Sequence, residues 1–83
     1  MIIQVLKIKK IEGNMVYIRR IGNLFEYILI YRGKIYQHYM KVKPRFVLKF
    51  NEDELNAIVR VLLTAATKVL KELKKKKKYE KAF

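Results

Sequence analysis

The chain has 83 residues, of which 52% are hydrophobic and 33% charged, and 20 Lys and Arg against 7 Asp and Glu give a net charge of +13. This length suits one domain over residues 1–83, the apolar fraction excludes a disordered chain, and the charge favours a polyanionic partner. The chain has no cysteine, no serine, no phosphate-binding glycine loop and no metal-ligand spacing, so we expect no enzyme activity, no cofactor and no metal site.

Three turn signals divide residues 2–50 into strands of an antiparallel sheet. They are Glu12-Gly13-Asn14, Gly22-Asn23 and Gly33-Lys34, where glycine supplies the positive φ of tight hairpin turns. They predict strands near residues 2–11, 15–21, 24–32 and 35–42. Pro44 has no N–H for a strand ladder, so a fifth short strand, or a continuation of the fourth, is expected at Phe46–Phe50.

The turns also predict which side chains share a face, because paired residues point the same way. Centring the first hairpin on Gly13 places Lys7 opposite Arg19 and Lys9 opposite Tyr17. The nearly apolar face, expected to form the core together with His38, is Leu6, Ile8, Val16, Ile18, Phe25, Tyr27, Leu29, Tyr31, Tyr36, Met40 and Val42. The opposite face is expected to hold Lys7, Lys9, Tyr17, Arg19, Glu26, Ile28, Ile30, Arg32, Gln37, Tyr39 and Lys41.

Residues 52–78 are predicted to form one amphipathic helix. Asn51 is a favourable N-cap, Glu54 completes a capping box, and Phe50 and Leu55 are placed to form a hydrophobic staple. Acidic residues begin the helix and lysines end it, as the helix dipole favours. The apolar stripe follows helical spacing: Leu55, Ile58, Val59, Leu62, Leu63, Ala66, Val69, Leu70 and Leu73.

The predicted helix is longer than a sheet of short strands is wide, since about 26 residues span ~39 Å. The apolar stripe would then extend beyond its own sheet and favour a homodimer. The residues assigned to dimerisation are Leu62, Ala66, Val69, Leu70 and Leu73. The alternative is a sheet that curls around the whole helix. The predicted class is α+β, a four- to five-stranded antiparallel sheet backed by one C-terminal helix.

The basic sheet face is the candidate functional site. Its Lys and Arg side chains would neutralise phosphates, and Tyr17 and Tyr39 would stack on unpaired bases. The residues assigned to nucleic-acid binding are Lys7, Lys9, Tyr17, Arg19, Arg32, Lys34, Tyr39, Lys41, Lys43 and Arg45. The run Lys74–Lys78 would widen this positive surface. We therefore expect sequence-tolerant binding of single-stranded nucleic acid, with DNA favoured over RNA.

Three other interpretations remain open. A small chromatin-type protein would coat duplex DNA and press Ile28 or Ile30 into the minor groove. A non-enzymatic viral or plasmid protein would use the long helix to bind a partner. A peripheral membrane protein would use the basic helix end, but Arg60 and Lys68 interrupt the most apolar segment and residues 1–10 lack a signal-peptide pattern. We expect a cytoplasmic protein without membrane contact, and DNA binding would associate it with the nucleoid.

The order of elements, with a helix that opens Phe50-Asn51-Glu52-Asp53-Glu54-Leu55, is similar to the fold of the transcriptional positive-cofactor and Whirly proteins. It also resembles the ThermoDBP-type proteins of thermophilic archaea, and the many Ile, Lys and Tyr with few Asn and Gln suggest a thermophilic source. The resemblance covers most of the chain as topology and rests on no signature motif. It implies dimers that associate through the helix and hold single-stranded DNA on the sheet.

Overall fold

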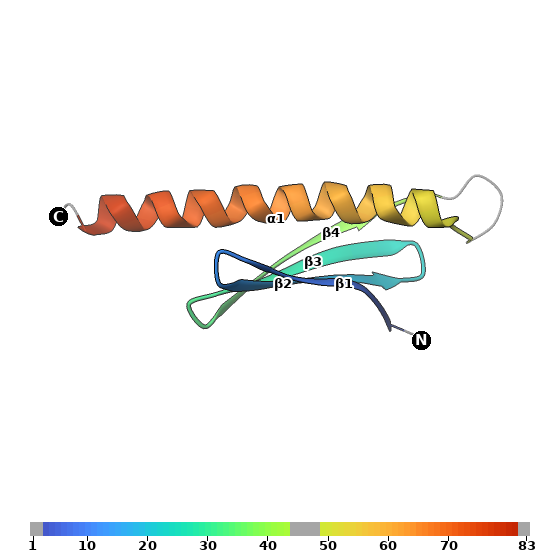
Figure 1. Ribbon diagram of the computed structural model, residues 1–83, viewed down its shortest axis with the longest axis horizontal. Helices are drawn as coiled ribbons and strands as arrows, with labels where there is room; N and C mark the ends of the chain where they lie inside the picture. The colour runs from blue at the N-terminus through green and yellow to red at the C-terminus, as the bar shows by residue number, and fades with distance from the viewer. Residues whose placement is uncertain (1–2, 44–48, 82–83) are drawn as a thin grey trace.

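The computed structural model describes residues 3–43 and 49–81, with the side chains of the helix described to residue 76. It has two layers, a four-stranded antiparallel sheet and one long helix lying across one of its faces (Figure 1). The elements are β1 (Ile3–Ile11), β2 (Asn14–Ile21), β3 (Leu24–Tyr31), β4 (Lys34–Lys41) and α1 (Glu52–Lys81). The strands pair in chain order, which confirms the predicted α+β class. Residues 44–48 lie outside the described residues, and with them Pro44, Arg45 and most of the expected fifth strand at Phe46–Phe50.

Three two-residue turns connect the strands. Glu12 and Gly13 both have positive φ, at 50° and 84°, and Arg32 and Gly33 repeat this pattern at 52° and 78°, as in type I′ hairpin turns. Gly22 has a φ of 61° at the first position of its turn, as in a type II′ turn. The observed strand ends agree with the predicted ones to within one residue. The three predicted hairpins are therefore confirmed, but the third turn is formed by Arg32 and Gly33 rather than by Gly33 and Lys34, so Arg32 lies in the turn and not on the sheet.

The predicted register of the first hairpin is wrong by one residue. Because Glu12 shares the turn with Gly13, Asn14 pairs with Ile11 rather than standing in the loop. Lys7 is therefore opposite Ile18 and Lys9 opposite Val16, not opposite Arg19 and Tyr17. A register shift between Val5 and Lys7 then reverses the facing of the residues that precede it. Ile3 and Val5 therefore lie on the same face as Ile8.

This register places Lys7 and Lys9 on the face that α1 covers, which we call the helix face. Ile8 moves from the expected core to the opposite face and is 54% exposed. The register of all four strands defines that opposite face, here called the outer face: Ile3, Val5, Ile8, Lys10, Met15, Tyr17, Arg19, Ile21, Leu24, Glu26, Ile28, Ile30, Ile35, Gln37, Tyr39 and Lys41.

The core lies between the helix face and α1. Its buried residues are Val16, Ile18, Phe25, Tyr27, Leu29, Ile58, Leu62, Ala66 and Leu70. Leu6, at the bulge of β1, still packs against this core, as do Tyr36 and Met40 on β4. The predicted core face is thus confirmed apart from Ile8 and from His38, which is exposed and stacks on the Tyr27 ring with centroids 5.8 Å apart.

The start of α1 has the predicted cap. The Asn51 side-chain oxygen accepts the N–H of Glu54 at 2.8 Å, and the Glu54 carboxylate accepts the N–H of Asn51 at 3.2 Å. Phe50 and Leu55 both pack against the core, and the Phe50 ring meets Phe25 edge-on with centroids 5.3 Å apart. The capping box fixes the start of α1, and the contacts of Phe50 and Leu55 with the core hold its first turn to the sheet.

The apolar stripe of α1 does not extend beyond the sheet, contrary to the expectation. α1 packs on β1, β2 and β3, with Leu62, Ala66 and Leu70 fully buried and Val69 and Leu73 packed against the same core. The residues assigned to dimerisation are therefore used within one chain. The part of α1 that passes the β1–β2 turn is rich in lysine and gives the molecule a length of 54 Å against a width of 20 Å (Figure 1).

Candidate nucleic-acid interface

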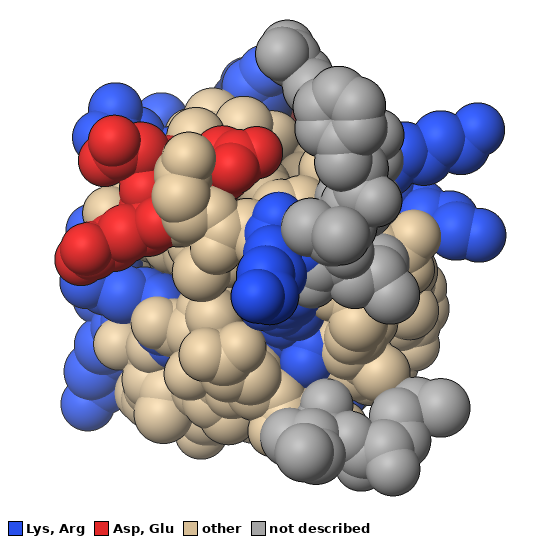
Figure 2. All heavy atoms as spheres, turned by 90° about the vertical axis from the view of Figure 1, so that its right-hand side faces the viewer, with Lys and Arg blue, Asp and Glu red and all other residues tan. Residues whose placement is uncertain are grey.

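Positive and negative side chains are distributed unevenly along α1. Glu52, Asp53 and Glu54 form its first turn. Figure 2 looks onto this end of the molecule and shows the acidic side chains gathered in one patch, while Lys and Arg side chains project on several sides. Three acidic side chains are therefore gathered at the first turn of α1, whereas lysines predominate in its second half.

The expected basic sheet face is not brought together. Of its residues, only Tyr17, Arg19, Tyr39 and Lys41 lie on the outer face. Lys7, Lys9 and Lys34 are on the helix-face register, Arg32 is in the β3–β4 turn, and Lys43 follows β4. Arg45 lies outside the described residues. The prediction of a continuous basic surface on the sheet was wrong, because one residue of register on β1 moved its two lysines to the other side.

The outer face is instead largely apolar. The large hydrophobic side chains that are exposed are Ile3, Val5, Ile8, Ile35, Tyr39 and Val61, and all but Val61 belong to this face. At its centre, Glu26 is buried, and its carboxylate accepts the Nε–H of Arg19 at 2.5 Å. The two are direct cross-strand partners. This pair cancels the charge of Arg19, so the remaining cations of the outer face are Lys10 and Lys41.

Lysines gather on the second half of α1, in a cluster that we call the basic helix end: Lys68, Lys71, Lys74, Lys75 and Lys76. Glu72 is the acidic residue among them, and Lys68, Lys71, Lys75 and Lys76 are exposed. Lys7 and Lys9 lie on β1, which runs toward the turn that Lys74 contacts. The basic helix end is thus in contact with the turn at the end of the edge strand β1.

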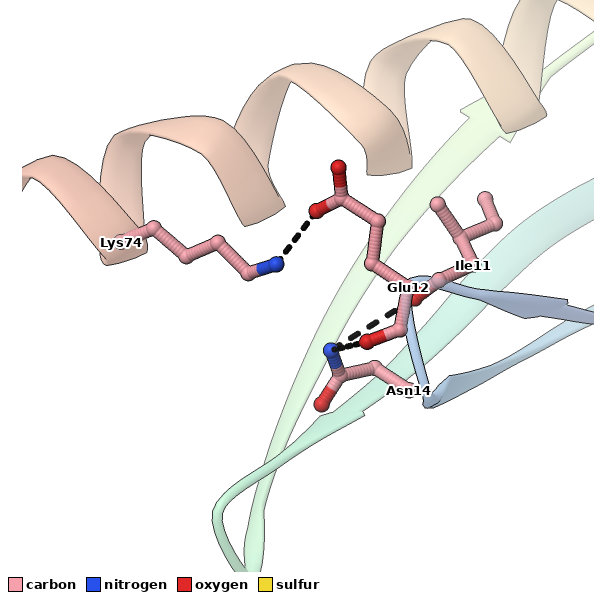
Figure 3. A network of polar contacts seen from close by, with 4 residues as sticks. All are labelled: Ile11, Glu12, Asn14 and Lys74. Carbon is pink, nitrogen blue, oxygen red and sulfur yellow. Dashed lines mark hydrogen bonds and ion pairs between the residues drawn. The ribbon is translucent and has the colours of Figure 1, made fainter.

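A contact between Lys74 and Glu12 ties the basic helix end to the sheet. Figure 3 shows the Lys74 ammonium donating to the Glu12 carboxylate at the β1–β2 turn, while the Asn14 amide donates to the Glu12 carbonyl at 3.1 Å. The hydrogen bond from Lys74, its charge and that of Lys71 lower the pKa of Glu12 below its ordinary value of 4.5. Glu12 and Glu72 are two acidic residues beside five lysines, so the basic helix end keeps an excess of positive charge.

Two arginines have structural contacts that the sequence did not indicate. The Arg20 guanidinium lies 4.8 Å from the Phe50 ring centroid and 5.8 Å from that of Phe25, and its Nε–H donates to the Gly22 carbonyl at 2.7 Å. Arg32 lies 5.7 Å from the Tyr31 ring centroid. The helical spacing of lysines from Lys68 onward was the signal that could have indicated the basic helix end. The run Lys74–Lys78 was interpreted as a solvated helix end that also extends the positive surface toward a polyanion.

A shallow depression on α1 is lined by Arg60, Val61, Thr64, Ala65 and Lys68, all from the same helix. No three His, Asp or Glu side chains within residues 3–43 and 49–81 are grouped so that they could hold a metal ion. In the same residues, no helix has both the length and the apolar character needed to cross a membrane.

No known protein family, curated protein or solved structure matches this chain. The resemblance to the positive-cofactor, Whirly and ThermoDBP-type proteins therefore stays a prediction. The function has to be argued from the placement of charged and apolar side chains alone.

Proposed function

We propose that the protein binds nucleic acid by contacting phosphates with the basic helix end, supported by Lys7 and Lys9 on β1. The observation that carries this proposal is the separation of charge along α1. Three acidic residues occupy its first turn, whereas five lysines and one glutamate lie between residues 68 and 76. Positive charge gathered on one part of a protein surface is the usual electrostatic signature of a nucleic-acid-binding protein.

The chemistry of the cluster favours binding without sequence preference. Its cations are all lysines, and contacts to phosphates position a protein on nucleic acid without reading the bases. Tyr17 and Tyr39 do not contribute here, because both lie on the outer face, on the far side of the sheet from α1. Binding is therefore expected to depend on charge and on salt rather than on base identity.

The preference for single-stranded DNA stays a prediction. It rested on stacking of bases on Tyr17 and Tyr39, and Tyr39 is 52% exposed. Competition between single-stranded and duplex oligonucleotides of the same length at one salt concentration distinguishes the two cases. A single-strand preference that Tyr39→Ala removes would support stacking, whereas equal affinities would indicate phosphate contacts alone.

The proposal is tested by titrating labelled mixed-sequence oligonucleotides at increasing salt. Replacing Lys68, Lys71 and Lys75 together by Gln removes three exposed charges and neither of the described ion pairs. The slope of log affinity against log salt should become shallower by about 3 for duplex and about 2 for single strands.

A matched variant removes the same charge elsewhere. Lys10, Lys34 and Lys41 are also exposed, and their triple replacement by Gln should leave the slope nearly unchanged. Equal losses in the two variants would contradict the assignment to the basic helix end. A salt slope near zero for the unmodified protein would contradict nucleic-acid binding by phosphates altogether.

A further inference from the structure

We propose that the outer face is the contact surface of a homodimer in which two sheets pack face to face. This inference does not rest on nucleic-acid binding. Its starting point is the one-sided architecture: α1 covers the helix face, and no described element covers the outer face (Figure 1). An antiparallel sheet with one face in water is expected to be polar on that face. The outer face has aliphatic and aromatic residues at most of its positions.

Exposure within the chain supports the need for a partner. Ile8 is 54% and Ile35 is 66% exposed, although they stand on the two edge strands of the same face. Isolated exposed hydrophobic residues are common on protein surfaces, but a contiguous patch usually marks a contact surface. The exposed hydrophobic residues of this face lie on β1 and β4, and the apolar residues between them on β2 and β3 are partly exposed, so the apolar surface reaches from one edge strand to the other.

The charges on the outer face favour a second copy over a polyanion or another charged partner. Arg19 and Glu26 form a mutually neutral pair at the centre, on β2 and β3. Lys10 and Lys41 lie at the ends of the edge strands. In a two-fold dimer the same patch meets itself, so the neutral centre would be buried and the two lysines would stay hydrated at the rim. A nucleic acid would find no uncompensated cation at the centre.

The area is sufficient for a small stable dimer. Four strands of eight residues, at about 4.8 Å between strands and 3.4 Å per residue, give a footprint of roughly 500 Å². Two such surfaces remove on the order of 1,000 Å² or more from water, which is the lower bound for a specific interface.

The experiment measures the mass of the full chain in solution by light scattering and sedimentation equilibrium at micromolar concentration. The unmodified protein should have twice the 10.0 kDa mass of one chain. Ile8→Lys with Ile35→Lys places charges inside the interface and should weaken association by roughly 100-fold or more. Val61→Lys is the matched control, because Val61 is 55% exposed but lies on α1.

The results separate the possibilities. A dimer that the double variant dissociates and Val61→Lys does not, with unchanged circular dichroism in both, supports the sheet interface. A monomeric unmodified protein overturns the inference, and so does a dimer that only Val61→Lys dissociates. Because the basic helix end is intact in the double variant, oligonucleotide binding should persist in it, so the inference and the proposed function can fail independently.

Discussion

Glu26 is the one buried charged residue in the described part of the chain, and it lies on the outer face, which is otherwise apolar at its centre. Its carboxylate is paired with the guanidinium of Arg19, which is 28% exposed. A buried carboxylate is tolerated when a cation and hydrogen bonds replace its lost hydration. Arg19 therefore compensates Glu26 within the sheet and is not a free cation for binding phosphate.

Arg19→Ala should lower the free energy of unfolding by about 3 kcal/mol, because it leaves Glu26 buried without its partner. The double change Arg19→Met with Glu26→Leu should recover most of this loss, since it removes both charges and keeps apolar volume. Urea denaturation at one protein concentration measures both variants. A loss in the double variant as large as in Arg19→Ala would show that packing of the arginine stem, rather than the unpaired carboxylate, determines the effect.

One residue, Glu12, explains why the candidate site was predicted less well than the fold. The sequence predicted a turn around Gly13, but a two-residue and a three-residue loop both satisfy a glycine at that position. The structure places Glu12 at a φ of 50°, which non-glycine residues seldom adopt, and so shifts the pairing of β1. Successive residues of a strand point to opposite faces of the sheet. A shift of one residue in the pairing therefore moved Lys7 and Lys9 to the helix face and Ile8 to the outer face.

At the scale of the helix, α1 shows how local signals specify an element. Asn51, Glu54, Phe50 and Leu55 stand at the spacing of a capping box with a staple. The structure contains both capping-box hydrogen bonds, and Phe50 and Leu55 both pack against the core. These signals depend on residues three to five positions apart, so no tertiary information is required to read them. The start of α1 was predictable for that reason.

Asn51→Ala should destabilise the protein by about 1 kcal/mol, because the N–H of Glu54 loses its acceptor. Asn56 is an exposed asparagine inside the same helix and provides the control. Asn56→Ala is expected to be neutral or slightly stabilising, since alanine has the higher helix propensity. Thermal unfolding followed by circular dichroism compares the two, and equal destabilisation would contradict a capping role for Asn51.

The length of α1 was predictable, but its relation to the sheet was not. The length of the whole predicted helix exceeded the width of the sheet, which suggested that the C-terminal part of its apolar stripe would have no partner in the same chain. The stripe itself, from Leu55 to Leu73, spans ~27 Å at 1.5 Å per residue, which matches strands of eight or nine residues. Only the lysine-rich part passes the β1–β2 turn, so α1 buries its apolar face within one chain and the outer face of the sheet remains uncovered.

At the scale of the molecule, two surfaces have different chemistry. The basic helix end carries most of the uncompensated charge of α1, and the outer face carries most of the exposed hydrophobic residues. They lie on opposite sides of the sheet, because α1 covers the helix face. The proposed nucleic-acid contact and the proposed dimer contact therefore use different surfaces, and a dimer through the outer face would leave both basic helix ends uncovered.

A net charge of +13 also predicts how stability depends on ionic strength. Repulsion among like charges opposes the compact state, and salt screens it over a distance of about 10 Å at 0.1 M. Raising sodium chloride from about 20 mM to 200 mM should therefore raise Tm, by roughly 5 °C for each kcal/mol of repulsion relieved.

Replacing Lys68, Lys71 and Lys75 by Gln should reduce this rise more than the triple replacement of Lys10, Lys34 and Lys41 does, because the first three stand within a few turns of one helix. Calorimetry at one protein concentration provides the measurement, and a Tm that falls with salt would show that attractive ion pairs such as Lys74 with Glu12 outweigh the repulsion.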